Sequence, residues 1–151
     1  MTVYTSDHAL YTAPSSAEAG EAKIYEGVYT FPAGITLSSG DIIQMVKIPL
    51  NHVITNAALT ISATLGSSST ALVGILNAAG TDSSATLIAD ATTAAAVANR
   101  NADTAAGLTS GPLSADTIVG LKVGTGGGAA ATTGAKVYLR VTYRPRQAYE
   151  G

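Results

Sequence analysis

The chain of 151 residues contains no cysteine, no tryptophan and a single phenylalanine, and charged residues make up only 12% of it. Without cysteine it can form no disulfide scaffold, no thiolate zinc site and no cysteine nucleophile. No apolar run approaches the roughly 18 residues that a membrane-spanning helix needs, so we expect no membrane partner. The N-terminal segment has neither a basic start nor an apolar stretch, which predicts that no secretory signal is present.

The chain also lacks an excess of positive charge: its net charge is -2 and its isoelectric point lies near 5.5. Phosphate contacts need a basic face, so we expect no nucleic-acid partner. Alanine, glycine, serine and threonine fill about half of the sequence, and these residues lose little side-chain entropy when they are covered. This composition favours a subunit that packs closely against neighbours, although a low-charge secreted domain would share it.

The candidate chemical groups are few and scattered. His8 and His52 are the only histidines, and no nucleophile-elbow motif accompanies them. The glycine run 124–128 is not followed by the Lys-Ser/Thr pair of a phosphate-binding loop. The acidic residues show no spacing typical of a metal site. We therefore predict no catalytic residue, no cofactor and no metal, and we interpret both histidines as satisfied surface or turn residues.

Alternating apolar and polar residues predict β-strands along much of the chain. The clearest alternation runs from Lys136 to Arg144, and a period of two is typical of a strand with one buried face. The segment 42–48 is apolar at most positions, which favours a strand covered on both sides. The loop 66–70 is short enough for a hairpin. The segments expected as strands are 23–31, 42–48, 53–65, 71–76, 117–123 and 136–144.

Turns rich in Gly, Ser and Pro separate these six segments, and weaker candidates near 87–88 and 108–109 raise the number to eight. No pattern of alternating strands and helices is present. We therefore predict an all-β fold, an antiparallel β-sandwich of jelly-roll or Greek-key type with an extended N-terminal arm. The expected division is an arm at 1–22, a sandwich at 23–145 and a C-terminal tail at 146–151.

The alanine-rich stretch 91–106 is ambiguous. Alanine favours a helix, but the many Thr, Asn and Asp residues favour caps and turns. Apart from Val97 the stretch has no large apolar residue that could anchor a helix on a core. We expect a long crossover with one helical turn.

The arm carries Tyr4 and Tyr11, whereas a disordered tail usually has few aromatic residues. We expect a partly ordered arm whose tyrosines lie on another surface, with a frayed terminus as the alternative.

One basic cluster stands near the end of the chain, where Lys136, Arg140 and Arg144 share the outward face of the last strand beside Tyr138. Two interpretations stay open. The charges can protect a solvated edge strand from unwanted pairing, or they can contact an acidic protein surface, since Arg and Tyr are common interface anchors. The candidate partner-binding residues are Tyr4, Tyr11, Tyr138, Arg140, Arg144 and Arg146.

The segment 41–49 (DIIQMVKIP), followed by 53–59 (VITNAAL), resembles the opening of tailed-phage virion proteins with the pattern G-D-x-I-x-M-V-x-[IL]-P-x-x-A-x-I. Further likeness lies in 66–74, 90–106, 114–118 and 134–143, so that the resemblance covers residues 27–144. The region 77–87 departs from the resemblance, because it lacks an Asp-Arg-aromatic run.

This resemblance implies a jelly-roll-like capsid decoration (cement) protein, or a related head or tail accessory protein. Such proteins bind the outside of the capsid, often as dimers or trimers, and fasten neighbouring capsomers. The implied partners are the major capsid protein and further copies of the chain, and the implied location is the outer capsid surface after synthesis in the host cytoplasm. The alternative function is a tail, fibre or host-receptor module that binds a glycan, although loops 66–70 and 124–134 contain no aromatic residue. An enzyme is not expected.

Overall fold

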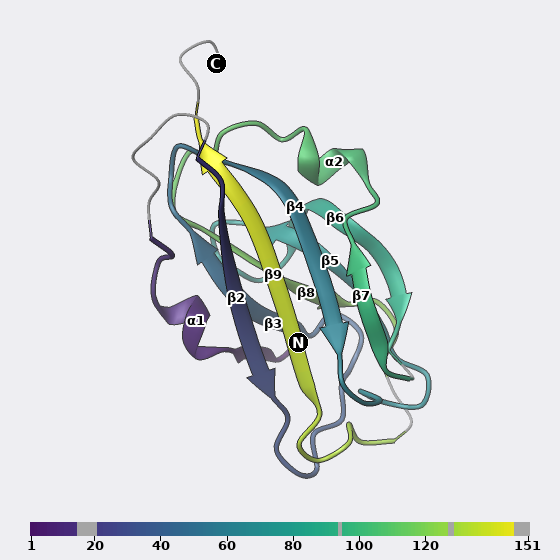
Figure 1. Ribbon diagram of the computed structural model, residues 1–151. Coiled ribbons are helices and arrows are strands. Elements are labelled where there is room, and N and C mark those ends of the chain that lie inside the picture. Colours follow the sequence, from purple (N-terminus) through teal and green to yellow (C-terminus); the bar gives the residue numbers. More distant parts are fainter. Residues whose placement is uncertain (15–20, 94, 127–128, 147–151) are drawn as a thin grey trace.

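The computed structural model is a sandwich of two β-sheets (Figure 1). It describes residues 1–14, 21–93, 95–126 and 129–146. Parts of the expected arm (15–20), the expected tail (147–151) and the glycine run (127–128) therefore lie outside the described residues. The strands are β1 (Val3–Thr5), β2 (Lys23–Thr30), β3 (Ile42–Ile48), β4 (His52–Ile61), β5 (Thr70–Leu76), β6 (Ser83–Thr92), β7 (Val97–Asn101), β8 (Thr117–Val123) and β9 (Lys136–Pro145), and the helical turns are α1 (Asp7–Leu10) and α2 (Ala105–Leu108).

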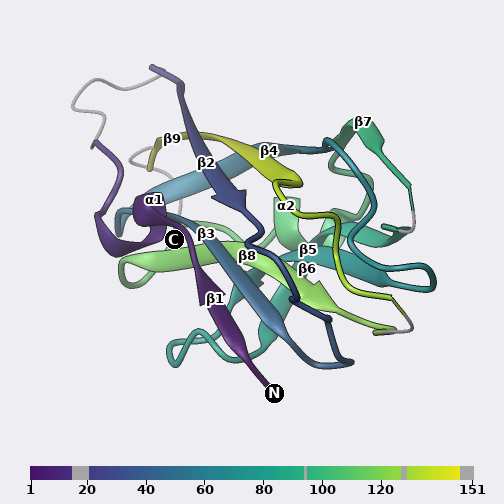
Figure 2. The ribbon, with the colours of Figure 1, turned by 90° about the horizontal axis from the view of Figure 1, so that it is seen from below.

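The strand order confirms the predicted fold class. One sheet has the order β1-β3-β8-β5-β6 and the other β2-β9-β4-β7, and Figure 2 shows them as two layers. Every pairing is antiparallel except that of β1 with β3. From β2 to β9, the chain crosses to the other sheet at every connection except the β5–β6 hairpin. This alternation between the two sheets is the winding of a jelly roll.

This winding shows that the expected hairpin at 66–70 is wrong. β4 belongs to the four-stranded sheet and β5 to the five-stranded sheet, so the loop between them crosses the sandwich. β4 ends at Ile61 instead of Leu65, and Leu65 is fully buried in the core within that crossing. Loop length alone cannot distinguish a hairpin from a crossing, because both are satisfied by a few turn-forming residues.

The apolar run in β3 has a different cause from the one expected. The register of β3 against β8 shifts between Gln44 and Val46, as in a β-bulge at Met45. The bulge reverses the parity of the strand, so that Met45 and Val46 both join the core although they are adjacent in sequence. A single buried face with a bulge therefore accounts for most of the run.

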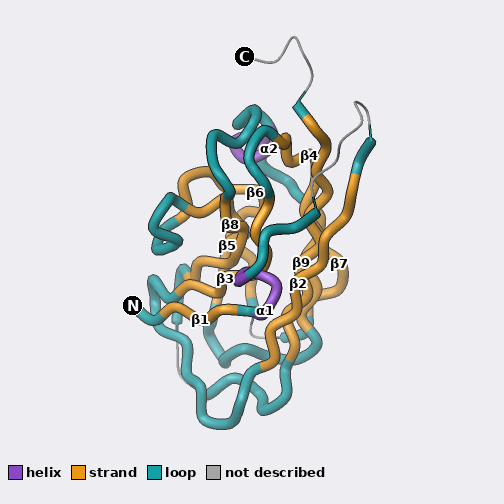
Figure 3. The backbone as a smooth tube through the Cα atoms, turned by 90° about the vertical axis from the view of Figure 1, so that its left-hand side faces the viewer, coloured by secondary structure: helices purple, strands orange, loops and turns teal. Residues whose placement is uncertain are grey.

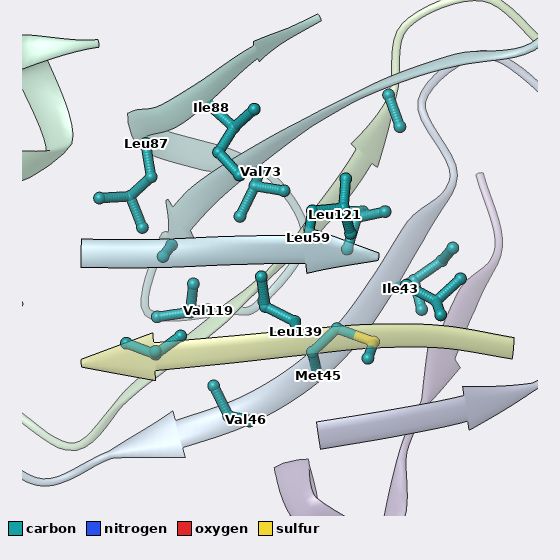
Figure 4. Close-up of a cluster of buried hydrophobic side chains, with 14 of the residues drawn as sticks. Ile43, Met45, Val46, Leu59, Val73, Leu87, Ile88, Val119, Leu121 and Leu139 are labelled. Carbon is teal, nitrogen blue, oxygen red and sulfur yellow. The ribbon is translucent and has the colours of Figure 1, made fainter. Parts of the chain in front are cut away.

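The core lies between the two sheets and draws on the inward residues of both. Figure 4 shows Ile43 and Met45 from β3, Leu59 from β4 and Leu121 from β8 converging with Leu139 of β9. All five side chains are fully buried. Each contributes roughly 1.5–3 kcal/mol on full burial.

The two weaker strand candidates in the middle of the chain have different outcomes. Leu87 and Ile88 lie in β6, which confirms the weaker candidate there. The candidate at 108–109 is wrong, because Leu108 ends α2.

The long crossover expected at 91–106 is wrong, because β6 extends to Thr92 and β7 lies within the stretch. The helical turn α2 overlaps only its last two residues. β7 was missed because Val97 is its one large apolar residue.

The described part of the arm packs on the sandwich itself. β1 extends the five-stranded sheet beside β3, and the Ser6 hydroxyl donates to the Met45 carbonyl at 2.5 Å. Ala13 is buried in the core, and the Tyr143 hydroxyl donates to the Pro14 carbonyl at 2.6 Å. Figure 3 shows α1 at the side of the sandwich, between β3 and β2.

Candidate interaction surface

The basic residues of β9 lie in the middle of a sheet. β9 pairs with β2 on one side and with β4 on the other, so the interpretation of a protected edge strand is wrong. The predicted alternation is confirmed: Val137, Leu139 and Val141 are buried, whereas Lys136 and Arg140 are exposed on the opposite face. Since a central strand needs no charge to block pairing, these cations require another explanation.

Strand register defines the surface around them. Arg140 stands opposite Glu26 of β2 and Ala58 of β4, and Tyr138 stands opposite Val28 and Thr60. We call this surface the outer face. It consists of Ile24, Glu26, Val28, Asn56, Ala58, Thr60, Lys136, Tyr138, Arg140, Thr142 and Arg144.

An ion pair lies at the centre of the outer face. Arg140 Nε donates to Glu26 Oε2 at 2.5 Å, and the two side chains remain 56% and 36% exposed. An exposed pair of this kind contributes little to folding stability. Its effect is to hold the guanidinium in one place among small and apolar neighbours, with its remaining N–H donors open to a partner's carboxylate or carbonyl oxygens.

Two further arginines lie near the end of β9: Arg144 is within the strand, and Arg146 directly follows it. Arg144 is half-buried, and its Nη1 donates to the Pro145 carbonyl at 3.2 Å. Arg146 is exposed, and its backbone N–H donates to the Asn51 carbonyl at 2.8 Å. The outer face itself carries three cations, Lys136, Arg140 and Arg144, beside the Glu26 carboxylate. It is therefore positively charged, although the net charge of the chain is negative.

The two arm tyrosines lie in different surroundings. The Tyr4 ring packs edge-on against Tyr29 and near Phe31, with centroids 6.0 and 6.2 Å apart. Burial, and secondarily the charge of Asp41, raises the pKa of Tyr4. Tyr11 is 71% exposed, so it offers a partner more surface than Tyr4 does.

The segment next to Tyr11 contacts the turn before β4 through Asp116. The Asp116 carboxylate accepts hydrogen bonds from the Thr12 hydroxyl at 3.2 Å and from the Leu50 N–H at 2.9 Å. This carboxylate therefore ties the arm to the turn before β4, where Leu50 is about half exposed. No pattern in the sequence predicts this contact.

The histidines only partly match their interpretation. His52 begins β4, is buried, and contacts the Leu50 carbonyl through Nδ1 and the Tyr143 ring edge-on. His8 packs against Tyr25, and its Nδ1 has no hydrogen-bond partner among the described residues. The expectation of a satisfied surface or turn histidine is therefore wrong for His8.

The five-stranded sheet has its own charged contacts. Lys122 binds Asp82 at 2.5 Å, and this hydrogen bond is the main cause of the lowered pKa of Asp82. An open cavity of about 690 Å³ lies beside this sheet, with Lys47 and Asp116 as the only charged residues in its lining. Within the described ranges, no group of three or more His, Asp or Glu side chains could hold a metal ion, and no helix is long and apolar enough to cross a membrane.

The likeness of this chain to known proteins is a likeness of fold. No protein-family model matches the chain, and no curated protein does either. Among solved structures, a chain of "Capsid of Ralstonia phage GP4" superposes with a TM-score of 0.78 at 23% identity. That match covers 97% of this chain and 100% of the other. The fold is shared with phage capsid structures.

A second structure supports the same likeness. A chain of "Cyanophage Pam1 capsid asymmetric unit" matches with a TM-score of 0.53 at 20% identity, covering 88% of this chain and 91% of that one. Both matches extend over nearly the whole of each chain. The shared feature is therefore the complete jelly roll and not one supersecondary motif.

Sequence reasoning found the part of the outer face that lies in β9. It identified Tyr138, Arg140 and Arg144 from their alternation in one strand. It missed Ile24, Glu26 and Val28 of β2, because only the pairing of β2 with β9 brings them alongside. The available signal was the negative charge of Glu26, which stands between the apolar and aromatic pairs 24–25 and 28–29.

Proposed function

We propose that this chain is a structural protein of a phage virion that decorates the outer surface of the capsid and cements neighbouring major capsid subunits. The observation that carries the proposal is the match over the full length of a chain in a phage capsid structure. A chain of the same extent and fold thus occurs as a component of a phage capsid. The resemblance of segments 41–49 and 53–59 to virion proteins supports the same function independently.

The outer face is the proposed contact with the major capsid protein. It is a β-sheet surface on which small and apolar side chains alternate with charged ones, and the Arg140 guanidinium is held at its centre by Glu26. Arginine and tyrosine supply most of the binding energy in many interfaces, which favours Tyr138, Arg140, Arg144 and Arg146 as contact residues. Tyr11, on the side of the arm, is the proposed additional contact, and Tyr4 contributes its exposed edge.

Cementing follows from selective binding to the assembled lattice. A protein that binds the assembled capsid and not its free subunits shifts the equilibrium toward assembly. If one oligomer, a dimer or trimer, spans several capsid subunits, each further contact forms at high effective concentration, so weak single contacts add up to firm attachment. This function requires no catalytic group, cofactor or nucleic acid.

Rebinding to capsids from which the protein has been removed tests this proposal. We expect the wild-type protein to bind such capsids and to raise the temperature at which they break. The Arg140→Ala variant should bind about tenfold or more weakly, since a hydrogen bond to a charged group contributes roughly 1.5–3 kcal/mol.

Lys122→Ala is the matched control, because it removes one exposed, ion-paired cation from the opposite sheet. It should bind as the wild type does. If saturating protein leaves bare capsids unchanged, the cementing function is refuted. If both variants bind equally well, the outer face is not the contact.

A further inference from the structure

The two sheets have four edge strands, which are β1 and β6 in one sheet and β2 and β7 in the other. An edge strand presents unpaired N–H and C=O groups that can pair with another chain. Proteins commonly protect such edges by shortening, covering or distorting them. Three of the four edges here show such protection.

The edge of β6 is covered by the residues that precede α2. The N–H groups of Asp103 and Thr104 donate to the Leu87 carbonyl at 3.0 and 3.3 Å. The Asp103 carboxylate accepts from the Ala89 N–H at 2.8 Å, and the Thr104 hydroxyl donates to the Thr86 carbonyl at 2.6 Å. The centre of this edge is therefore occupied.

The edges of β7 and β1 are protected by shape and by length. β7 shifts register against β4 between Leu59 and Ile61, and Asn99 has a φ of 45°, in the left-handed region. Both features bend an edge away from straight pairing. β1 has only three residues, which is too short for extended pairing.

Among the described residues, β2 is neither short nor distorted, and only α1 covers part of it. It has eight residues and a continuous register with β9. The Phe31 N–H donates to Ala135, so by the alternation of antiparallel pairing the odd-numbered residues bond to β9 and the even-numbered ones point to the open edge. α1 packs against β2 through His8 and Tyr25 (Figure 3), which leaves Ile24 67% exposed.

We propose that β2 pairs antiparallel with β2 of a second copy, which joins the two four-stranded sheets across a two-fold axis. Two copies of this edge can approach each other without strong charge repulsion. The charge of Glu26 is compensated by Arg140, and the other even-numbered residues of β2 are uncharged. An isologous contact of this kind closes as a dimer. It would present two outer faces side by side on one continuous surface.

Like charges repel when they stand directly opposite each other, and this sets the register. Hydrogen bonding requires even-numbered residues to face even-numbered residues. Placing Glu26 opposite Val28 of the second copy avoids a Glu26–Glu26 pair and sets Ile24 opposite Thr30 of the second copy. The two-fold axis then passes beside Gly27.

This inference deepens the proposed function, since a dimer can bridge more capsid subunits than one copy can. The experiment that tests the dimer uses the full-length protein without capsids. A negative result would therefore refute the dimer and leave the proposed capsid function standing. We expect sedimentation to show a dimer, and amide exchange to show concentration-dependent protection at Ile24, Glu26, Val28 and Thr30. The odd-numbered amides of β2 should be protected at every concentration.

Two substitutions at one position separate backbone pairing from side-chain packing. Ile24→Pro removes an N–H for which the described residues supply no hydrogen-bond partner, and edge strands tolerate proline. It should weaken the dimer about tenfold or more, whereas Ile24→Ala, which keeps the N–H, should weaken it much less. Leu50→Ala, at an exposed apolar residue far from β2 in the chain, should leave the dimer unchanged.

Cysteine pairing tests the register without relying on proline, because the natural chain has no cysteine. An equal mixture of the Ile24→Cys and Thr30→Cys variants should form a disulfide-linked heterodimer on mild oxidation, and each variant alone should crosslink much less. The proposal is overturned by a wild-type protein that stays monomeric up to about 100 μM. It is also overturned by a dimer whose even-numbered β2 amides exchange as fast as in the monomer, or by equal crosslinking of the single variants and their mixture.

Discussion

Substituting Gly27 by alanine tests how the two sheets are held together. Gly27 lies in β2 and faces the bulge of β3, where a Cβ atom would stand 2.3 Å from the Met45 carbonyl oxygen and 2.8 Å from Val46 Cγ1. Carbon–oxygen contacts in proteins normally lie at about 3.3–3.6 Å. The alanine methyl group would therefore require a displacement of about 1 Å.

Neither partner can move freely. Gly27 is fixed in register with Leu139 of β9, and the Met45 carbonyl is held by the Ser6 hydroxyl. Overpacking of this kind costs roughly 1–3 kcal/mol, and the lower entropy of the unfolded alanine chain returns about 0.4–1 kcal/mol. We expect a net loss of roughly 1–2 kcal/mol, which lowers the melting temperature by about 2–8 °C for a chain of this size.

Urea unfolding and thermal melting of Gly27→Ala measure this loss. The control is Val28→Ala, which trims the neighbouring half-exposed residue on the outer face and should cost less than about 1 kcal/mol. If Gly27→Ala is as stable as the wild type, the contact between β2 and the bulge does not set the sheet spacing, and our account of the bulge is refuted.

Three further predictions concern the core and two titrating groups. Leu139→Ala removes a fully buried side chain from the centre of the sandwich and should cost about 2–5 kcal/mol in urea unfolding; a cost below that of a surface substitution would contradict the core assignment. Burial, and secondarily the nearby Tyr25, raises the pKa of Tyr143, so the folded state favours the neutral phenol. The free energy of unfolding should therefore fall as the pH rises above the ordinary tyrosine pKa near 10. Tyr143→Phe should show a smaller loss of stability between about pH 8 and pH 11. An unchanged loss would assign the effect to the partly buried Tyr4 and Tyr29, whose pKa values are also raised. The Ala89 N–H, and then Arg100, lower the pKa of Asp103, so its contribution is present above the ordinary aspartate value and should be lost as the pH falls below it. Asp103→Asn should therefore differ least from the wild type in acid, as measured by melting at about pH 6 and about pH 2.5, and a difference that grows in acid would reverse the sign of the effect.

The sequence predicts local structure well where one face of an element is buried. The alternation in β9 fixes both its strand character and the direction of Arg140, because period two is maintained over the whole strand. The run in β3 also identifies a strand, but its apparent two-sided burial arises from the bulge at Met45. A bulge changes parity by one residue, and composition carries no signal for it.

Long-range pairing could not be predicted to the same extent. The sequence does not show that β9 lies between β2 and β4, so it could not exclude an edge position or place Glu26 beside Arg140. The loop 66–69 could equally join two strands of one sheet or cross the sandwich. β7 has too few apolar residues to be recognised, and only its pairing with β4 defines it.

Electron cryo-microscopy of particles with and without this protein tests the central claim most directly. Particles that contain the protein should show additional jelly-roll density on the outer capsid surface, with the β2-β9-β4-β7 sheet facing the major capsid subunits. That density should be absent from particles made without the protein. Identical maps, or additional density confined to the tail, would contradict the account.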